Sequence, residues 1–193
     1  MTVIGILAPE NVRKIEATLR KMFSQNHKRV ATVNGMSTTE DELYSLKRIG
    51  TDYCIILFNK GRICPHYVDI LIIDNSKNEN IISYDLIKCI SPSTRLIYNI
   101  DNQFLPRIEH PNAIDYGLSR SATVTVSSID PQRDGTSFVY CIQRPFRTLF
   151  DTRLEEGELL VNLSFEKQDV SNLLPAVTCG LLCGLLTNDK VKI

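Results

Sequence analysis

Apolar residues follow two different periods along the first two-thirds of the chain. Val3–Leu7 is a short continuous apolar run, whereas in Asn11–Ser24 apolar residues recur every three or four positions opposite a basic face. The first pattern is typical of a buried strand and the second of an amphipathic helix. The same patterns predict strands at Arg29–Val33, Tyr53–Phe58, Val68–Ile73, Arg95–Ile100 and Ala113–Leu118, and helices from Ser37 or Thr38 to about Ile49 and at Glu79–Ile90. This alternation predicts an α/β fold with a doubly wound, mainly parallel sheet.

The third and fourth predicted strands are almost entirely apolar. Tyr53–Phe58 has no charged residue and Val68–Ile73 has only Asp69, as expected of strands covered on both faces. Only the nine residues Asn59–Tyr67 join them. That link is too short for a long crossover helix, so this connection departs from the simple alternation.

The pattern changes after about residue 119. Apolar and polar residues alternate in Ala122–Ser128, and turn residues separate the runs that follow. We expect an antiparallel meander with further strands at Ser137–Gln143, Phe146–Leu154 and Leu159–Phe165, and a last helix from Val170 or Ser171 to Leu186, with Asn172 as a possible N-cap and Pro175 in its first turn. The chain then forms one domain over residues 1–193: a parallel part (1–119), a meander (120–168) and a C-terminal helix that packs back (169–193).

Charge and composition exclude several classes of protein. The 193 residues carry 22 basic and 22 acidic side chains, which argues against a nucleic-acid partner. The longest apolar run, Leu173–Leu186, is interrupted and shorter than the ~20 residues of a membrane span. The first residues do not resemble a secretory signal. We therefore expect a cytoplasmic protein with reduced cysteines and no membrane span.

Side chains that could carry metal or nucleophilic chemistry are scattered. Cys64 and His66 could form half of a metal site, and Cys179 and Cys183 lie one helical turn apart, but neither pair has an evident second half. Core packing is the simpler interpretation of the second pair. Gly180 and Gly184 on the same helix predict close packing against the sheet. We identify no catalytic residue and no metal site.

The turn after the first strand is where a mononucleotide-binding fold places its phosphates. Here it reads Ala8-Pro9-Glu10-Asn11, with no glycine, a proline that removes one backbone donor, and a glutamate that repels phosphate. Arg13 and Lys14 are the compensating charges. They belong either to a solvated helix face or to a residual anion site.

The order and spacing of these pieces resemble the central, ATP-binding domain of the Mur ligase family, a P-loop NTPase-like domain. The similarity covers nearly the whole chain. It is carried by Leu96–Asn102 (the family's Asn-x-Asp-Asp strand end), Ile114–Ser119 (its Tyr-Gly-Leu strand), Thr123–Ile129, Val161–Phe165 and Asp169–Ala176. Members of this family join amino acids to cell-wall precursors through an acyl-phosphate. The resemblance implies a Mur-ligase-like fold, with ATP and Mg²⁺ as possible cofactors.

The departures from this family fall on its catalytic parts. Val12 stands at the position of the P-loop lysine, Leu57 at that of a magnesium-binding glutamate, and no histidine follows Asp74-Asn75. We expect no counterpart of the domains that precede and follow this one in the family. Loss of such electrostatic groups typically costs ~10²–10³-fold each. The residues left for nucleotide or anion binding are Arg13, Lys14, Asn75, Asn99, Asp101 and Asn172, the last matching a family asparagine near the adenine; capping and turn formation explain them equally well.

These observations favour a catalytically degenerate Mur-ligase-like domain, a pseudoenzyme that acts by binding or as a scaffold. Its partner would be an intact ligase subunit or a second copy of the chain. One alternative is an ATP-dependent amide ligase that is active only with a partner subunit supplying the missing groups. Another is a sensor of a small ligand at the carboxyl ends of the strands.

Overall fold

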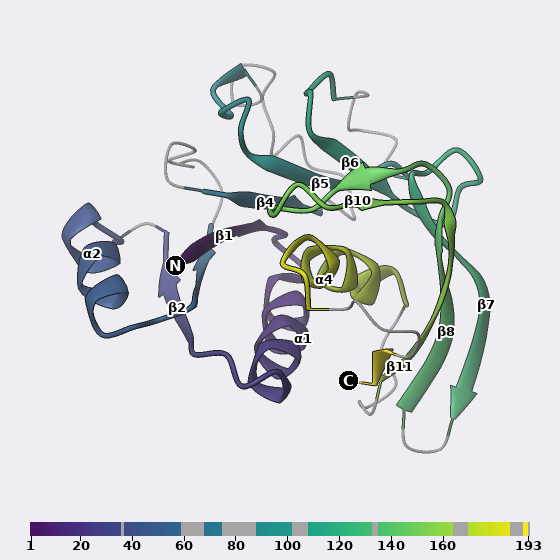
Figure 1. Cartoon of the computed structure of the whole chain (residues 1–193), viewed down its shortest axis with the longest axis horizontal. Helices are drawn as coiled ribbons and strands as arrows, with labels where there is room; N and C mark the ends of the chain where they lie inside the picture. Colours follow the sequence, from purple (N-terminus) through teal and green to yellow (C-terminus); the bar gives the residue numbers. More distant parts are fainter. Residues whose placement is uncertain are drawn as a thin grey trace.

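The computed structural model describes residues 1–35, 37–58, 68–74, 88–101, 108–132, 135–163, 170–185 and 191–192 (Figure 1). Its helices are α1 (Val12–Gln25), α2 (Glu40–Arg48) and α4 (Val170–Leu182). Its strands are β1 (Thr2–Leu7), β2 (Val30–Asn34), β3 (Tyr53–Leu57), β4 (Ile70–Ile73), β5 (Arg95–Asn99), β6 (Ala113–Tyr116), β7 (Val124–Gln132), β8 (Gly135–Ile142), β9 (Phe146–Arg147), β10 (Arg153–Leu154), β11 (Gly157–Leu163) and β12 (Val191–Lys192).

One mixed sheet runs through the molecule in the order β12-β11-β8-β7-β6-β5-β4-β1-β3-β2. Strands β1 to β6 pair in parallel, with β1 between β3 and β4. Every residue of β3 and β4 is buried, because layers of side chains cover both faces of these strands. The prediction of a doubly wound, mainly parallel sheet is confirmed.

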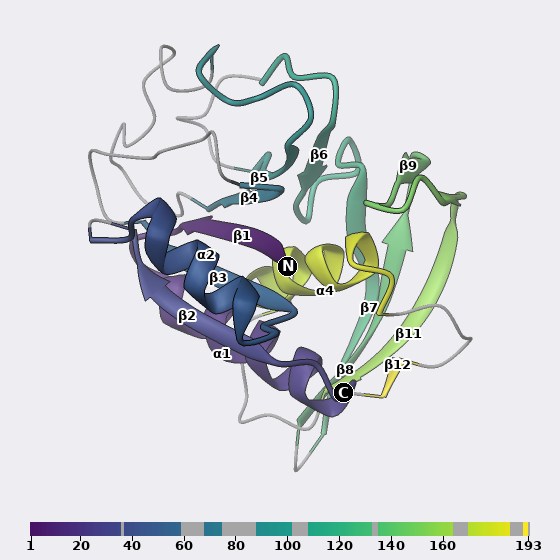
Figure 2. The same ribbon diagram turned by 60° about the vertical axis from the view of Figure 1, so that its left-hand side comes forward.

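Helices α1 and α4 lie side by side on one face of the sheet (Figures 1 and 2). On α1, Ile15, Leu19 and Phe23 are buried, so its apolar face meets the sheet and its basic face meets solvent. The Phe23 ring stacks on that of Tyr53, with the centroids 4.0 Å apart. Helix α2 lies on the other face, where Leu43 and Leu46 pack against a separate apolar cluster that includes Val3, Ile56 and Leu71. The two layers explain why the parallel strands contain so few polar residues.

The meander continues the same sheet and curves around α4 (Figure 1). Strands β7, β8 and β11 pair antiparallel, as predicted. Phe138 and Tyr140 of β8 point into the core that contains α4, and the Tyr140 hydroxyl lies 2.8 Å from Thr178 Oγ1. The parallel part and the meander therefore share one apolar core around α4.

Several features of the fold differ from the sequence prediction. The expected strand Phe146–Leu154 is wrong, because the chain turns back at Asp151, whose φ is +60°, so that β9 and β10 form a short hairpin. The N-cap of α2 is Thr39, which accepts from the Glu42 N–H at 3.2 Å, whereas Thr38 donates to the Asn34 carbonyl. Strand β12 was not expected at all.

The last helix also differs. Because α4 begins at Val170, Asn172 lies inside its first turn and is not the N-cap, and Pro175 lies within the helix. Gly184, with φ +69°, ends the helix: the Leu185 N–H donates to the Gly180 carbonyl at 3.0 Å. Since glycine adopts this left-handed conformation without strain, Gly184 is explained as a helix stop.

Several predictions fall on residues outside the described ranges. These are the link Asn59–Tyr67 with Cys64 and His66, most of the helix Glu79–Ile90, and the candidate Asn75.

Cys54, Cys141, Cys179 and Cys183 are free and buried, and Cys89 is free and exposed. Burial raises the pKa of Cys54 to about 11 and that of Cys179 well above its usual value, which keeps both thiols protonated. Among the described residues, no group of three or more His, Cys, Asp or Glu side chains could hold a metal ion. No described helix has both the length and the apolar character needed to cross a membrane.

Candidate functional site

The corner between β1 and α1 is a tight turn that uses its own backbone donors. The N–H groups of Asn11 and Val12 both donate to the Ala8 carbonyl, at 3.0 and 2.7 Å. In an anion-binding corner, the first N–H groups of the helix point at the ligand. Here two of them are bound within the chain.

A buried carboxylate lies beside this corner. Asp74 follows β4 directly and is 2% exposed. Its carboxylate accepts from Asn11 Nδ2 at 2.9 Å and from Asn99 Nδ2 at 3.2 Å, and its backbone N–H donates to the Leu7 carbonyl. Polar groups at the carboxyl ends of the neighbouring parallel strands β1, β4 and β5 thus meet at one point. This is the edge of the sheet where α/β folds place their sites.

Tyr116, at the end of β6, extends this cluster. Its hydroxyl is buried and makes no hydrogen bond of normal geometry with a described residue. Burial raises the pKa of Tyr116 well above its usual value, and the negative charges of Asp74 and Asp101 raise it further. The cluster of Asn11, Asp74, Asn99 and Tyr116, which we call the Asp74 cluster, therefore combines one carboxylate with neutral partners.

Asp101, predicted as a binding residue, builds the neighbouring loop. Its backbone N–H donates to Asn99 Oδ1 at 3.0 Å, and its carboxylate accepts the N–H groups of Leu118 and Ser119. A Cβ at Gly117 would lie within 2.7 Å of that carboxylate, so the loop passes too close for a larger residue. These bonds satisfy both carboxylate oxygens of Asp101 within the protein.

The other predicted residues lie apart from the Asp74 cluster. Arg13 is in the first turn of α1, pairs with Glu16 at 2.9 Å, and its side chain is 77% exposed; Lys14 is exposed. Asn172 is buried on α4. Among the hydrogen bonds between described residues, none joins Arg13, Lys14 or Asn172 to Asn99 or Asp101. The structure thus brings together two of the five described candidates.

Arg13 does line a pocket of about 210 Å³. Val12, Thr32, Val33, Asn34 and Leu57 complete its wall, so it opens at the carboxyl ends of β2 and β3. Arg13 is the only charged residue in this lining. The pocket can therefore accommodate a small ligand with at most one strong charge contact.

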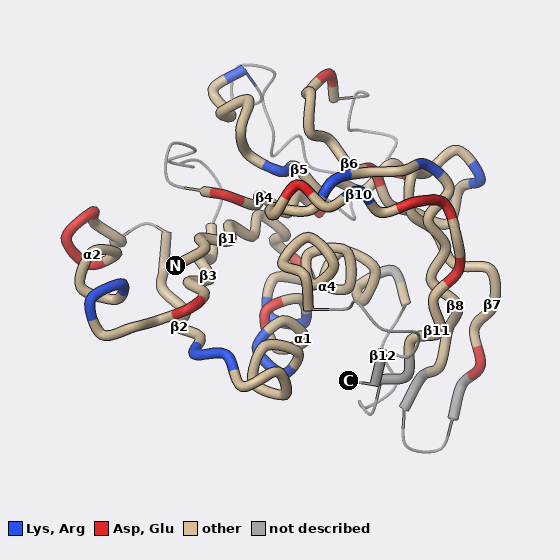
Figure 3. Tube along the Cα trace, in the orientation of Figure 1, with Lys and Arg blue, Asp and Glu red and all other residues tan. Residues whose placement is uncertain are grey.

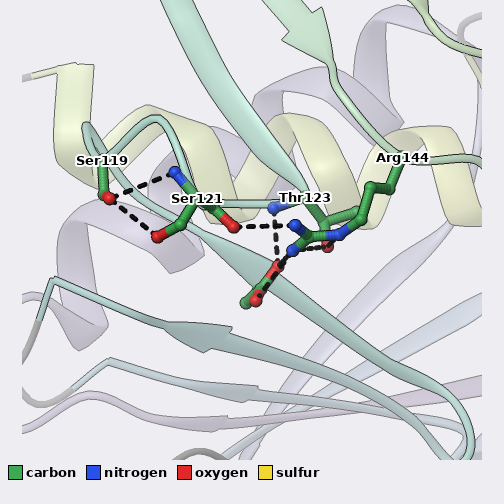
Figure 4. Close-up of polar contacts among 5 residues, drawn as sticks. Ser119, Ser121, Thr123 and Arg144 are labelled. Carbon is green, nitrogen blue, oxygen red and sulfur yellow. Dashed lines mark hydrogen bonds and ion pairs between the residues drawn. The ribbon is translucent and has the colours of Figure 1, made fainter.

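A second buried carboxylate joins the parallel part to the meander (Figure 4). Asp115 accepts from Arg144 Nη2 at 2.8 Å and from the Thr123 N–H at 2.6 Å. The same guanidinium donates to Thr123 Oγ1 and to the Ser121 carbonyl. The Ser119 and Ser121 hydroxyls are bonded to each other at 2.8 Å. This arrangement supports the interpretation of Ser119-Arg120-Ser121 as a polar junction into the meander.

Sequence reasoning missed Asn11, Asp74, Asp115 and Arg144 as paired polar residues. Asp74 could have been predicted from the sequence. It is an acidic residue directly after a buried strand, and the same position at a strand end led to the prediction of Asn99. Arg144 had none, since its partner lies 29 residues earlier and the fold alone brings them together.

Comparison with solved structures gives clear matches. A UDP-N-acetylmuramoyl-L-alanyl-D-glutamate–2,6-diaminopimelate ligase matches with a TM-score of 0.66 and 13% identity, over 95% of this chain and 44% of its own. MurF from Acinetobacter baumannii matches with a TM-score of 0.63 and 14% identity, over 95% and 43%. MurF from Thermotoga maritima, solved with ADP, matches with a TM-score of 0.59 and 14% identity, over 97% and 47%.

The chain has a Mur-ligase-like fold. It spans less than half the length of each of these structures. No family model matches the sequence, and no curated protein is significantly similar to it. At 13–14% identity the likeness concerns the fold. It confirms the expected architecture of parallel sheet, antiparallel strands and final helix.

Proposed function

We propose that residues 1–193 act as one Mur-ligase-like domain that binds or scaffolds a partner and does not activate a carboxylate with ATP by itself. The observation that carries this proposal is the Asp74 cluster. A buried carboxylate lies beside the N-terminus of α1, bound by Asn11, where a phosphate-binding fold needs donors and positive charge.

Electrostatics supports the same conclusion. Phosphoryl transfer to a carboxylate depends on positioned cations that neutralise the developing charge. Around Asp74 the described partners are amide groups, and the guanidinium of Arg13 is directed to Glu16. A triphosphate at this corner would meet the Asp74 charge without a cation positioned against it.

The chemistry of the partner follows from the likeness to enzymes that assemble cell-wall precursors. We propose that the chain works beside an intact amide ligase or as a homodimer. A partner that supplied a lysine and a metal ligand in trans would make the chain part of a working ligase, with ATP and Mg²⁺ bound at the shared site. The pocket beside Arg13 favours a further possibility, the recognition of a small ligand at the strand ends.

Calorimetric titration of the purified chain with ATP and MgCl₂ tests this proposal. We expect no saturable heat up to millimolar nucleotide. A Mur ligase of known activity, titrated in the same buffer, is the positive control. Magnesium-dependent binding at micromolar ATP by the chain alone would refute the degenerate interpretation, and binding only after a ligase subunit is added would favour the shared site.

A further inference from the structure

The outer face of the meander carries a row of polar side chains across three strands. Val124 and Val126 of β7 pack against the apolar core around α4, so Thr125 between them faces the opposite way. Thr125 pairs with Cys141 of β8, and Cys141 pairs with Glu158 of β11. A hydroxyl, a thiol and a carboxylate therefore lie next to one another on the face of the meander that is turned away from α4.

These three residues line a cavity of about 540 Å³, which we call the meander pocket. Ser127 also lines it, where the pairing of β7 with β8 shifts between Val126 and Ser128. Leu118 and Arg120, in the loop between β6 and β7, add an apolar and a basic side chain to the lining. The volume lies within the range of about 300 to 1,000 Å³ that is typical of small-ligand sites.

The loop that carries Leu118 and Arg120 is held in place by other parts of the protein. The Asp101 carboxylate accepts the Leu118 N–H. With its amide nitrogen turned toward the loop, Gln143 donates to the Arg120 carbonyl at 2.7 Å and to the Ala122 carbonyl at 3.0 Å. A ligand that enters the meander pocket would therefore not have to order this loop, which favours binding.

Three polar side chains of the pocket keep unused hydrogen-bonding capacity. Thr125 is 6% exposed, and its hydroxyl makes no hydrogen bond to any residue that the structure describes. The exposed Arg120 guanidinium has neither an ion pair nor a hydrogen bond with a described residue. Among the described side chains, only the Cys141 thiol donates to Glu158, at 3.5 Å. Burial raises the pKa of Cys141, so this thiol stays neutral, and the Glu158 carboxylate keeps most of its acceptor sites.

The two charged side chains are attached at separate places. Glu158 lies opposite Cys141, whereas the Arg120 carbonyl is bound by Gln143, two residues further along the chain. At about 3.4 Å per residue in a strand, these two points are about 7 Å apart. Charged residues of both signs lie along the chain at this end of the meander (Figure 3). A ligand that meets both side chains therefore fits best if its own two charges are well separated.

We propose that the meander pocket binds an elongated zwitterion, a small molecule with a carboxylate at one end, an ammonium group at the other and a short apolar chain between them. The carboxylate pairs with the Arg120 guanidinium, whose fork of N–H donors matches it, and the ammonium group pairs with Glu158. The Thr125 hydroxyl gains a hydrogen-bonding partner in the ligand. Leu118, which is 58% exposed, packs against the apolar chain.

The opposite signs of the two charges are the reason to choose a zwitterion over a nucleotide or a polyamine. A multiply charged anion would be repelled by Glu158, and a multiply charged cation would be repelled by Arg120. A zwitterion with separated charges satisfies both side chains at once.

The proposal does not depend on the proposed function. The meander pocket shares no residue with the Asp74 cluster and lies on the face of the meander opposite to α4. The titration with ATP and the titration with a zwitterion therefore have independent outcomes.

Nuclear magnetic resonance of the isotope-labelled whole chain, titrated at low salt with ε-aminocaproic acid, tests the proposal. Low salt is used because salt screens exposed charges. We expect saturable shifts of the amide signals of Arg120, Cys141 and Gly157, all of which line the pocket. Norleucine is an isomer with its two charged groups next to each other. It is the matched control and should bind at least about tenfold more weakly, because it reaches only one of the two side chains. Absence of saturable binding at millimolar ε-aminocaproic acid, or an equal affinity for norleucine, would overturn the proposal.

Protein variants test which side chains bind the ligand. Arg120→Gln and Glu158→Gln should each raise the dissociation constant about tenfold, because each removes one charge-assisted contact. Glu156→Gln, on the same turn as Glu158 but outside the lining, is the control and should leave it unchanged. Thr125→Val should raise the dissociation constant about threefold without lowering stability to urea, since the hydroxyl has no partner among the described residues. The same dissociation constant in the wild type and in both glutamine variants would overturn the site.

Ligands with a single charge assign each end of the zwitterion. Caproic acid lacks the ammonium group, so Glu158→Gln should not weaken its binding. Hexylamine lacks the carboxylate, so Arg120→Gln should not weaken its binding. If Glu158→Gln weakens caproic acid and ε-aminocaproic acid by the same factor, or Arg120→Gln weakens hexylamine and ε-aminocaproic acid by the same factor, the proposed pairing is wrong.

Discussion

Two nearly buried carboxylates lie in neighbouring parts of the sheet and are satisfied in different ways. Asp115, at the junction of β6 with the meander, has the Arg144 guanidinium and a backbone N–H as partners. Asp74, at the carboxyl end of β4, accepts from the side-chain amides of Asn11 and Asn99. Asp115 is therefore in contact with a positive charge, whereas Asp74 is in contact only with the dipoles of neutral amide groups.

The difference separates a structural joint from a polar cluster at the carboxyl ends of the parallel strands. A buried carboxylate with a guanidinium and several hydrogen bonds fixes the geometry around it. A buried carboxylate held by neutral groups keeps its charge uncompensated in that environment. We infer that Asp115 holds the two parts of the sheet together, and that Asp74 excludes anions from the corner that related folds use for phosphate.

The largest effect is expected from Asp115→Ala. The substitution leaves Arg144 without its charge partner and Thr123 without an acceptor, and should lower the free energy of unfolding by about 2 to 3 kcal/mol, less than for a fully buried pair because Arg144 is half-exposed. Urea denaturation followed by circular dichroism measures it. Glu156→Gln, on an exposed turn, is the control. A loss similar to that of the control would show that the joint is not stabilising.

Asp74→Asn tests the opposite role. The amide keeps one acceptor for Asn11 or Asn99, so stability should change by no more than about 1 kcal/mol. Affinity for pyrophosphate or ADP should rise, because the substitution removes the negative charge beside the α1 N-terminus. Titration calorimetry of the two proteins at low salt measures this change. An identical, undetectable affinity in both would mean that the closed turn at Ala8 alone excludes the anion.

Tyr116→Phe tests the link between Asp74 and the phenol through pH. Because the pKa of Tyr116 is raised in the folded protein, the unfolded chain ionises above pH 10 while the folded protein keeps the proton. Above pH 10, the stability of the wild type should therefore fall with pH more steeply than that of the variant, by about 1.4 kcal/mol per pH unit. At lower pH the two proteins should show the same dependence of stability on pH. Urea unfolding between neutral pH and pH 11 follows the two curves. Parallel curves would contradict the assigned pKa shift.

Arg144→Lys should have a smaller effect on the joint than Asp115→Ala. Lysine keeps the charge next to Asp115 but cannot donate in a planar fork to Asp115, Thr123 and the Ser121 carbonyl together. We expect a loss of about 1 kcal/mol by urea denaturation. A loss as large as that of Asp115→Ala would mean that geometry, and not charge, dominates the joint.

The local patterns predicted the strands and helices well. Val3–Leu7 and Tyr53–Phe58 became β1 and β3 within one residue at each end, because continuous apolar runs and 3.6-residue periodicity reflect burial directly. The Phe146–Leu154 prediction failed at Asp151, where a left-handed residue reverses the chain inside an otherwise strand-like stretch. The N-cap of α4 also failed, since Val170 already belongs to the helix and several nearby polar residues fit the cap pattern.

The candidate site was predicted only in part. Asn99 was found because it ends a strand, and it does bond to Asp74. Arg13 and Lys14 were chosen for charge and position, yet the structure places them at the surface with Arg13 bound to Glu16. Charge on a helix can be read from sequence, but the direction of each side chain depends on its neighbours in space.

The sequence by itself determined the architecture: the order of strands and helices, the change from a parallel part to a meander, and the absence of glycine from the Ala8–Asn11 turn. These properties follow from local periodicity and composition, which need no contacts between distant residues. Only the tertiary structure decided that Asp74 accepts hydrogen bonds from Asn11 and Asn99, that Arg144 donates to Asp115, and that β2 is the last strand of the sheet. Each depends on residues far apart in the chain, and sheet order, which sets their proximity, is fixed by packing of the whole core.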